Sequence, residues 1–179
     1  MPTPVHRSFV WTSIITLFLD QLTKTVIYGM FARPNTPPSV SIIGNILKIS
    51  FTTNPSGVFG LKFGPPWFHF LLQGSGIVLL LFFVLRNKNY FLSYAYGIIL
   101  GGALGNLIDR IRLGYVIDFI DFEIRAIRFR WFTFNLADAF IVIGVIMIFF
   151  YEFIIGIKQR KECKSENAGL SGQQFHNPN

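Results

Sequence analysis

The chain has 179 residues, enough for one domain; 51% of them are hydrophobic and 14% are charged. Soluble domains carry about 25% charged residues, so this composition predicts a membrane protein. The net charge of +7 suits contact with anionic lipid headgroups, and no separate basic segment is present to bind nucleic acid. The single cysteine, Cys163, excludes an internal disulfide and any metal site built from several cysteines.

Four apolar blocks predict four membrane-spanning helices, at about residues 9–31, 67–85, 90–108 and 134–157. Each block is about 19 to 24 residues long, and a helix rising about 1.5 Å per residue then crosses a hydrocarbon core about 30 Å thick. The first block has the short basic lead of a removable signal peptide. It is kept as a helix because it is long, lacks an A-x-A-like cleavage site and contains Asp20 and Lys24.

The loops between these blocks differ in length and pattern. The loop at about residues 32–66 contains SVSIIGNILKISFTT, which predicts a β-hairpin around Gly44 and Asn45. The loop at about residues 109–133 contains RAIRFRWF, which is expected at the membrane interface and is a candidate lid. We therefore expect an all-α membrane domain over residues 1–157 with a small extracytoplasmic β-hairpin or sheet in its first loop. The polar, basic tail of residues 158–179 is expected to lose regular structure after its first turn.

The charges of the loops give a weak signal for orientation. Four crossings place both termini on one side of the membrane and the two long loops on the other. The termini and the short turn carry seven Lys and Arg residues and the long loops carry eight, so the positive-inside rule is tied. We favour cytoplasmic termini, because the charges of the turn and the tail lie directly against helix ends.

Carboxylates gather at one edge of the third block. The chain has nine acidic residues, and four of them fall within fifteen positions: Asp109, Asp118, Asp121 and Glu123. A fifth, Asp138, opens the fourth block. Ionisable groups at membrane depth are unfavourable by roughly 2.5 kcal/mol or more, which makes each of them a candidate functional residue. Two carboxyls held close together cannot both ionise easily, so one can act as an acid and the other as a base on a water molecule. That chemistry suits hydrolysis of an acyl bond.

Structural interpretations of the same residues remain open at this point. Asn135 and Asp138 have the spacing of a helix cap, in which the acid is favoured by the positive end of the helix dipole. The glycines that recur every four residues in the third block, Gly97, Gly101 and Gly105, predict a smooth ridge for close packing of another helix.

Other chemistries have less support. The three histidines are scattered and no H-E-x-x-H helix is present, which argues against a metalloprotease. Ser75, between two glycines, lacks a base at suitable spacing. The rival class is a small transporter or proton relay in which Asp20, Lys24 and Asp138 line a pathway. Against it, the chain shows no internal repeat, and its acids cluster at one membrane face.

Five motifs, in this order between about residues 8 and 157, are DQLTK, NPSGVFG, GGALGNLIDR, VIDF and FNLADAF. Together they resemble lipoprotein signal peptidase (signal peptidase II). The resemblance implies a multi-pass aspartic endopeptidase of the bacterial inner membrane, without a cofactor, that removes signal peptides from prolipoproteins before a diacylglyceryl-modified cysteine. It also implies cytoplasmic termini and an active site near the extracytoplasmic face. Besides these substrates, we expect membrane lipids as partners, and the enzyme to be a monomer.

The resemblance also assigns roles to individual residues. It implies that Asp118 of VIDF and Asp138 of FNLAD form the catalytic pair. The residues that match its supporting or substrate-binding positions are Asn54, Asn106, Asp109, Arg110, Asn135, Asp20 and Lys24. Asp20 and Lys24 are four residues apart on one helix, so we expect them to form an ion pair.

Two features depart from the family pattern. Ser56 stands where the first-loop motif normally has glycine, which leaves the role of Asn54 open. The third loop has additional acids, and Asp121 could replace Asp118 on spacing alone. In an extended segment, however, residues three apart face opposite sides, so we expect Asp121 to point away from a site that contains Asp118.

Overall fold

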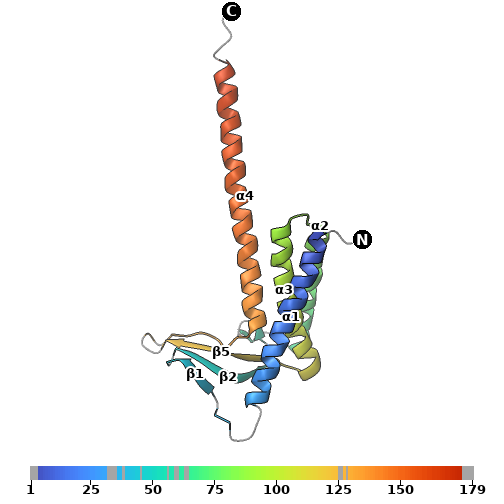
Figure 1. Ribbon diagram of the computed structural model, residues 1–179, viewed down its shortest axis with the longest axis vertical. Coiled ribbons are helices and arrows are strands. Elements are labelled where there is room, and N and C mark those ends of the chain that lie inside the picture. The colour runs from blue at the N-terminus through green and yellow to red at the C-terminus, as the bar shows by residue number, and fades with distance from the viewer. Residues whose placement is uncertain are drawn as a thin grey trace, which may run out of the picture.

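In the structure, a computed structural model, four long helices run side by side for part of their length and a small sheet lies across one end of them (Figure 1). The structure describes residues 4–31, 36–37, 39–44, 46–55, 57–58, 61–62, 65–124, 127 and 129–174. Ser56 and Asn45, as well as residues 125, 126 and 128 of the candidate lid, therefore lie outside the described residues.

The four helices are α1 (Pro4–Phe31), α2 (Pro66–Arg86), α3 (Tyr90–Leu113) and α4 (Leu136–Gln174). All four are long and apolar enough to cross a membrane, which confirms the predicted spans. Two ends differ from the prediction. Helix α3 continues to Leu113 before Gly114 ends it in the left-handed conformation, with φ of 79°. Helix α4 continues to Gln174, so the expectation of an irregular tail is wrong for residues 158–174; this segment is rich in Lys, Glu and Gln, which extend a helix readily.

The predicted glycine ridge packs α3 against α1. A Cβ atom at Gly97 would lie 2.7 Å from the backbone oxygen of Phe9, and one at Gly101 would lie 2.6 Å from the backbone oxygen of Ser13. At Gly105 the added atom would collide with the carboxylate of Asp20. The absence of side chains along this ridge therefore brings the end of α3 close to the charged part of α1.

We expect Gly101→Ala to lower the stability of the folded protein by about 1–3 kcal/mol, because the new methyl group overlaps the α1 backbone, which cannot move aside cheaply. Gly74→Ala in α2 is the matched control, since nothing lies within 4 Å of a Cβ atom there. The measurement is the thermal unfolding midpoint in detergent. Equal midpoints for the two variants would contradict the close packing of α1 and α3.

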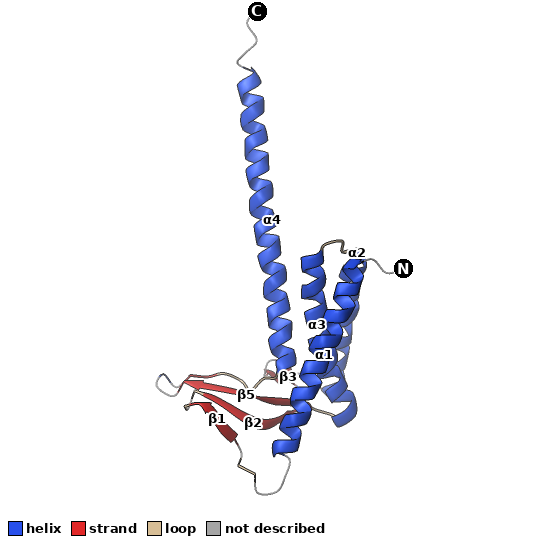
Figure 2. Ribbon diagram, viewed as in Figure 1, coloured by secondary structure: helices blue, strands red, loops and turns tan. Residues whose placement is uncertain are grey.

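The sheet combines both long loops (Figure 2). In spatial order, its strands are β1 (Ser39–Ile43), β2 (Leu47–Asn54), β5 (Val116–Ile124) and β6 (Phe129–Arg130). Each neighbouring pair of strands is antiparallel. A separate short ribbon pairs β3 (Gly57–Val58) with β4 (Leu61–Lys62). The predicted hairpin is confirmed as β1 and β2, with Gly44 at a positive φ of 51° in the turn.

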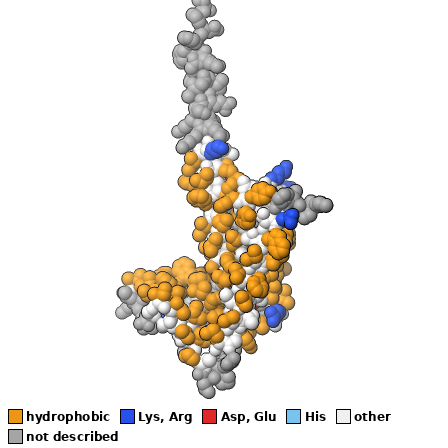
Figure 3. Space-filling view, viewed as in Figure 1, with side chains coloured by type: hydrophobic (Ala, Val, Ile, Leu, Met, Phe, Trp, Pro, Cys, Tyr) orange, Lys and Arg blue, Asp and Glu red, His pale blue; other side chains and the backbone are white. Residues whose placement is uncertain are grey.

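The pairing of β2 with β5 is the part of the sheet that the sequence reasoning missed. Thr52 lies opposite Asp118, and Asn54 lies opposite Val116, so the first loop is fixed beside the third. The sheet lies at one end of the helix bundle, and α1 begins and α4 ends on the side away from the sheet (Figure 1). On the face seen in Figure 3, hydrophobic side chains cover the helices and continue onto the sheet, with separate Lys and Arg side chains near the edges.

Candidate active site

Strand β5 carries Asp118 into the junction between the sheet and the helices, where its side chain is buried with 2% exposure. The amide of Asn135 donates a hydrogen bond to its Oδ1 at 2.7 Å, and the amide of Asn54 donates to its Oδ2 at 3.0 Å. Burial, together with the nearby charge of Asp138, raises the pKa of Asp118 to about 7, although the two amide donors and Lys24 act in the opposite direction. This carboxyl can therefore keep a proton at a pH where an exposed aspartate has lost it.

Asp138 lies in the first turn of α4 and faces the same junction. The amide of Asn106 donates to its Oδ1 at 2.8 Å. The interpretation as a helix cap is confirmed: the side-chain oxygen of Asn135 accepts from the backbone N–H of Asp138 at 3.0 Å, and the backbone N–H of Asn135 donates to Asp138 Oδ2 at 3.4 Å. The cap fixes the direction of the Asp138 carboxyl, so the structural and the chemical interpretations are compatible.

Asn135 links the two carboxyls directly. Its side-chain nitrogen contacts Asp118, and its backbone nitrogen contacts Asp138. The same side-chain nitrogen donates to Asn106 Oδ1 at 3.0 Å, so Asn106 joins the network from α3. Asn135 is fully buried and Asn106 is 6% exposed, which keeps bulk water from competing for these bonds.

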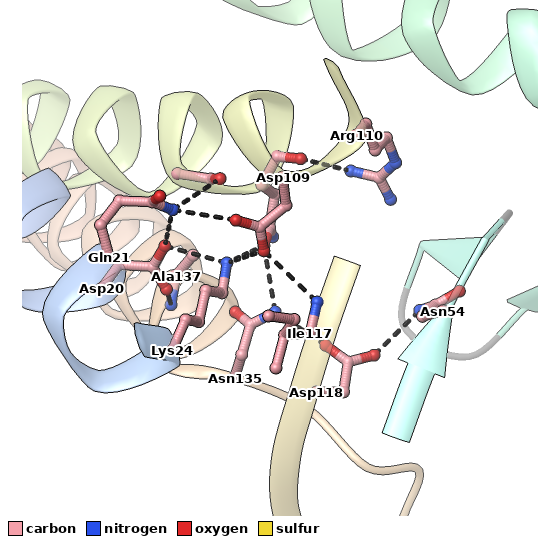
Figure 4. A network of polar contacts seen from close by, with 12 residues as sticks. Asp20, Gln21, Lys24, Asn54, Asp109, Arg110, Ile117, Asp118, Asn135 and Ala137 are labelled. Atoms are coloured by element: carbon pink, nitrogen blue, oxygen red, sulfur yellow. Dashed lines mark hydrogen bonds and ion pairs between the residues drawn. The ribbon is translucent and has the colours of Figure 1, made fainter. Parts of the chain in front are cut away.

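A second polar cluster lies beside this network, where α1 meets α3 (Figure 4). The ammonium group of Lys24 contacts Asp20 Oδ2 and Asp109 Oδ2, both at 2.9 Å, which confirms the predicted pair of Asp20 and Lys24 and adds a second carboxylate to it. It also donates to Asn106 Oδ1 at 2.8 Å. The sequence reasoning missed Gln21, whose amide donates to Asp109 Oδ1 at 3.0 Å.

A cavity of about 340 Å³ lies between α2, α3 and α4 and reaches Asp138. Asn106 and Arg110 line it from α3, and the Arg110 guanidinium donates to Gln73 Oε1 of α2 at 2.9 Å. His69 and Gln73 line the cavity from α2; sequence reasoning had dismissed the histidines as scattered and had overlooked Gln73. Two polar residues four positions apart within an apolar span were the signal that could have found them.

Asp121 has a different environment, as the alternation of the strand predicts. Its carboxylate pairs with Arg130 of β6 at 3.0 Å, away from the described residues that contact Asp118. Among the described residues, no group of three His, Cys, Asp or Glu side chains is arranged to hold a metal ion. Asp118 and Asp138, which Asn135 joins, are described carboxyls that could act together in acid–base chemistry.

Comparisons with known proteins identify the family of the chain. The profile of the family described as Signal peptidase (SPase) II matches residues 12–154. The lipoprotein signal peptidase of Nostoc punctiforme is 37% identical over 150 residues, which cover 83% of this chain and 90% of that protein. The lipoprotein signal peptidase of Trichormus variabilis is 39% identical, with 80% and 87% covered.

The fold has a counterpart among solved structures. A bacterial membrane enzyme solved by the in meso method at 2.3 Å resolution matches with a TM-score of 0.68 and 30% identity, covering 87% of this chain and 90% of that one. The family profile runs from within α1 to within α4, and the relatives also cover most of the chain. The chain therefore belongs to the signal peptidase II family of aspartic peptidases.

Proposed function

We propose that Asp118 and Asp138 are the reacting pair of a membrane-embedded endopeptidase that cuts prolipoproteins just before a diacylglyceryl-modified cysteine. The observation that carries this assignment is the bridge made by Asn135, which donates to Asp118 Oδ1 at 2.7 Å and to Asp138 Oδ2 at 3.4 Å. The bridge holds carboxyls from a loop strand and a helix start in one buried network. A pair of this kind can share one proton.

The chemistry follows from one protonated and one ionised carboxyl. The ionised carboxyl removes a proton from a water molecule, and the water oxygen bonds to the carbonyl carbon of the scissile peptide. The protonated carboxyl donates a hydrogen bond to the oxygen that gains negative charge. When the carbon–nitrogen bond breaks, a proton passes to the leaving nitrogen, which leaves a carboxylic acid on the signal peptide and a free amine on the cysteine.

The cavities beside Asp138 support a binding mode for such a substrate. We place the signal peptide in the cavity between α2, α3 and α4, where Gln73 and Arg110 offer polar contacts to an extended backbone. A second cavity, of about 470 Å³, also reaches Asp138 and is lined by apolar side chains of the third loop and α4, including Trp131, Phe134 and Val142. We place the acyl chains of the modified cysteine there.

For orientation, we propose that both termini lie in the cytoplasm and that the sheet and the site face the opposite side of the inner membrane. The support is that α1 begins and α4 ends on the side away from the sheet (Figure 1), and that the family resemblance implies a cytoplasmic location for this side. One chain supplies both carboxyls and the residues bonded to them, so we propose that a monomer is sufficient for activity. The alternative of a transporter is set aside by the family match.

The purified chain is expected to cut a diacylglyceryl-modified precursor on the amino-terminal side of the cysteine. A precursor of the same sequence without the lipid is expected to react at least about 100-fold more slowly, because it loses the apolar contacts that hold the cysteine beside the carboxyls. Mass spectrometry of the products identifies the bond that is cut. Equal rates for the two precursors would contradict the acyl site beside Asp138.

A further inference from the structure

The residue before each proposed reacting group is held through its backbone N–H by one buried carboxylate. Asp20 Oδ1 accepts the backbone N–H of Ala137, the residue before Asp138, at 3.0 Å. Asp109 Oδ2 accepts the backbone N–H of Ile117, the residue before Asp118, at 3.3 Å. A carboxylate from α1 thus fixes the start of α4, and a carboxylate from α3 fixes the start of β5.

Lys24 joins these two carboxylates (Figure 4). Its ammonium group has three N–H donors, and they meet Asp20 at 2.9 Å, Asp109 at 2.9 Å and Asn106 at 2.8 Å. The side chain is 2% exposed, so water does not replace these contacts. The Nζ atom of Lys24 therefore pairs with both carboxylates that hold the backbone, those of Asp20 and Asp109.

The contact with Asn106 also sets the direction of an amide. Asn106 Oδ1 accepts from Lys24 at 2.8 Å and from Asn135 at 3.0 Å, so its amide nitrogen must face the other way. That nitrogen donates to Asp138 Oδ1 at 2.8 Å. If the amide of Asn106 were flipped, it would lose its hydrogen bonds from Lys24 and Asn135. Its oxygen would then face the carboxylate of Asp138, which is unfavourable.

We propose that Lys24 is a positioning residue for catalysis: its ammonium group locks Asp20, Asp109 and Asn106, and through them sets the separation and direction of Asp118 and Asp138. In the described part of the chain, Lys24 forms no hydrogen bond or ion pair with either reacting carboxyl, so it acts through its three partners. Because Asp118 and Asp138 are the proposed reacting groups, this role rests on the proposed function. Misplacement of such groups by a fraction of an ångström is enough to slow the reaction.

The buried positive charge also favours an ionised carboxyl in the pair. Lys24 lowers the pKa of Asp118, against the larger effects of burial and of Asp138. Besides Asp118, the charged and titratable groups that face this junction among the described residues are Lys24 and Asp20 from α1, His69 from α2, Asp109 and Arg110 from α3, and Asp138 from α4; β2 contributes the neutral Asn54. Removing a positive charge from this set should therefore move the pH profile of catalysis to higher pH. Removing a negative charge should move it to lower pH.

The first test is Lys24→Met, which keeps the length of the side chain and removes its charge and its three hydrogen bonds. We expect kcat to fall about tenfold or more, with KM for the lipid-modified precursor nearly unchanged and the pH optimum raised by about half a unit or more. The matched control is Lys48→Met, which removes an ion pair with Glu123 at 3.1 Å on the sheet and is expected to keep the parental kcat and pH optimum.

The second test is Asp20→Asn, which keeps the shape of the side chain and an oxygen for the Ala137 amide. It removes a negative charge, so we expect a smaller loss of kcat, about threefold to tenfold, and a pH optimum moved to lower values. A role limited to folding would change the amount of active enzyme and leave both pH profiles in place. If Lys24→Met does not yield folded protein, Asp20→Asn decides alone.

Opposite shifts of the pH optimum, with kcat lowered and KM retained, would support the positioning role. Unchanged optima in the folded variants, or shifts in the same direction, would overturn it. The parental chain is assayed beside the variants on the same precursor. If the parental chain fails to cut, the proposed function itself fails; if it cuts and the variants behave like it, only the role of Lys24 fails.

Discussion

Replacing Asp118 or Asp138 by asparagine is expected to lower kcat by at least about 1000-fold, because each variant removes either the acid or the base from the proposed pair. KM should change little, since the cavities that hold the substrate remain. The double variant should be hardly slower than either single variant, because two groups that act as one unit are not additive. The measurement is the rate of cleavage of a lipid-modified precursor by purified protein, and, in cells, accumulation of that precursor.

The matched control is Asp121→Asn, on the same strand and equally acidic. Its carboxylate pairs with Arg130, whose side chain is 65% exposed, so the loss of this pair should change stability by less than about 1 kcal/mol and kcat by less than about twofold. In Asp118→Asn the new amide nitrogen would face a donor from Asn54 or Asn135, so the unfolding midpoint is measured for every variant. Normal cleavage by a folded Asp118→Asn or Asp138→Asn variant would contradict the assignment.

Features of the fold that depend on neighbouring residues could be predicted from the sequence. The four spans follow from runs of apolar residues, and the pair of Asp20 and Lys24 follows from a spacing of four on one helix. The close packing along Gly97, Gly101 and Gly105 follows from their period, although the period does not say that α1 is the helix that packs there. Each of these features depends only on residues that are close together in the sequence.

Features that depend on distant pairing could not be predicted in the same way. The pairing of β2 with β5 joins two loops separated by two helices, and its register includes a bulge between Ile49 and Thr52. The contact of Lys24 with Asp109 depends on how α1 and α3 are rotated against each other. The contacts of Asp20 and Asp109 with backbone N–H groups leave no trace in residue identity, since every residue except proline offers one. The family resemblance was needed to single out Asp118 and Asp138 before the structure placed Asn135 against both.

The pH dependence of cleavage is expected to have an alkaline limb near pH 7. Burial and the charge of Asp138 raise the pKa of Asp118, which lies outside the membrane spans, from 3.8 to about 7. Below that value the pair retains the proton that catalysis needs, and above it the pair loses the proton. Values of kcat/KM should therefore fall as pH rises above about 7, by about tenfold per unit and about 100-fold by pH 9, and should also fall in acid when the pair takes up a second proton. The two limbs belong to the pair as a whole, because interacting carboxyls titrate together.

Two controls separate this effect from others in the same pH range. Because the folded pKa is raised, stabilisation by the bound proton is complete below the unfolded value of 3.8 and is lost as pH rises through about 7, so the unfolding midpoint is measured at each pH. His69 lines the cavity next to Asp138, so the His69→Gln variant is assayed in parallel. An alkaline limb that persists in His69→Gln belongs to the carboxyl pair. A limb that disappears in that variant, or a rate that stays constant from about pH 6 to 9 in folded protein, would show that no shared carboxyl proton limits the reaction.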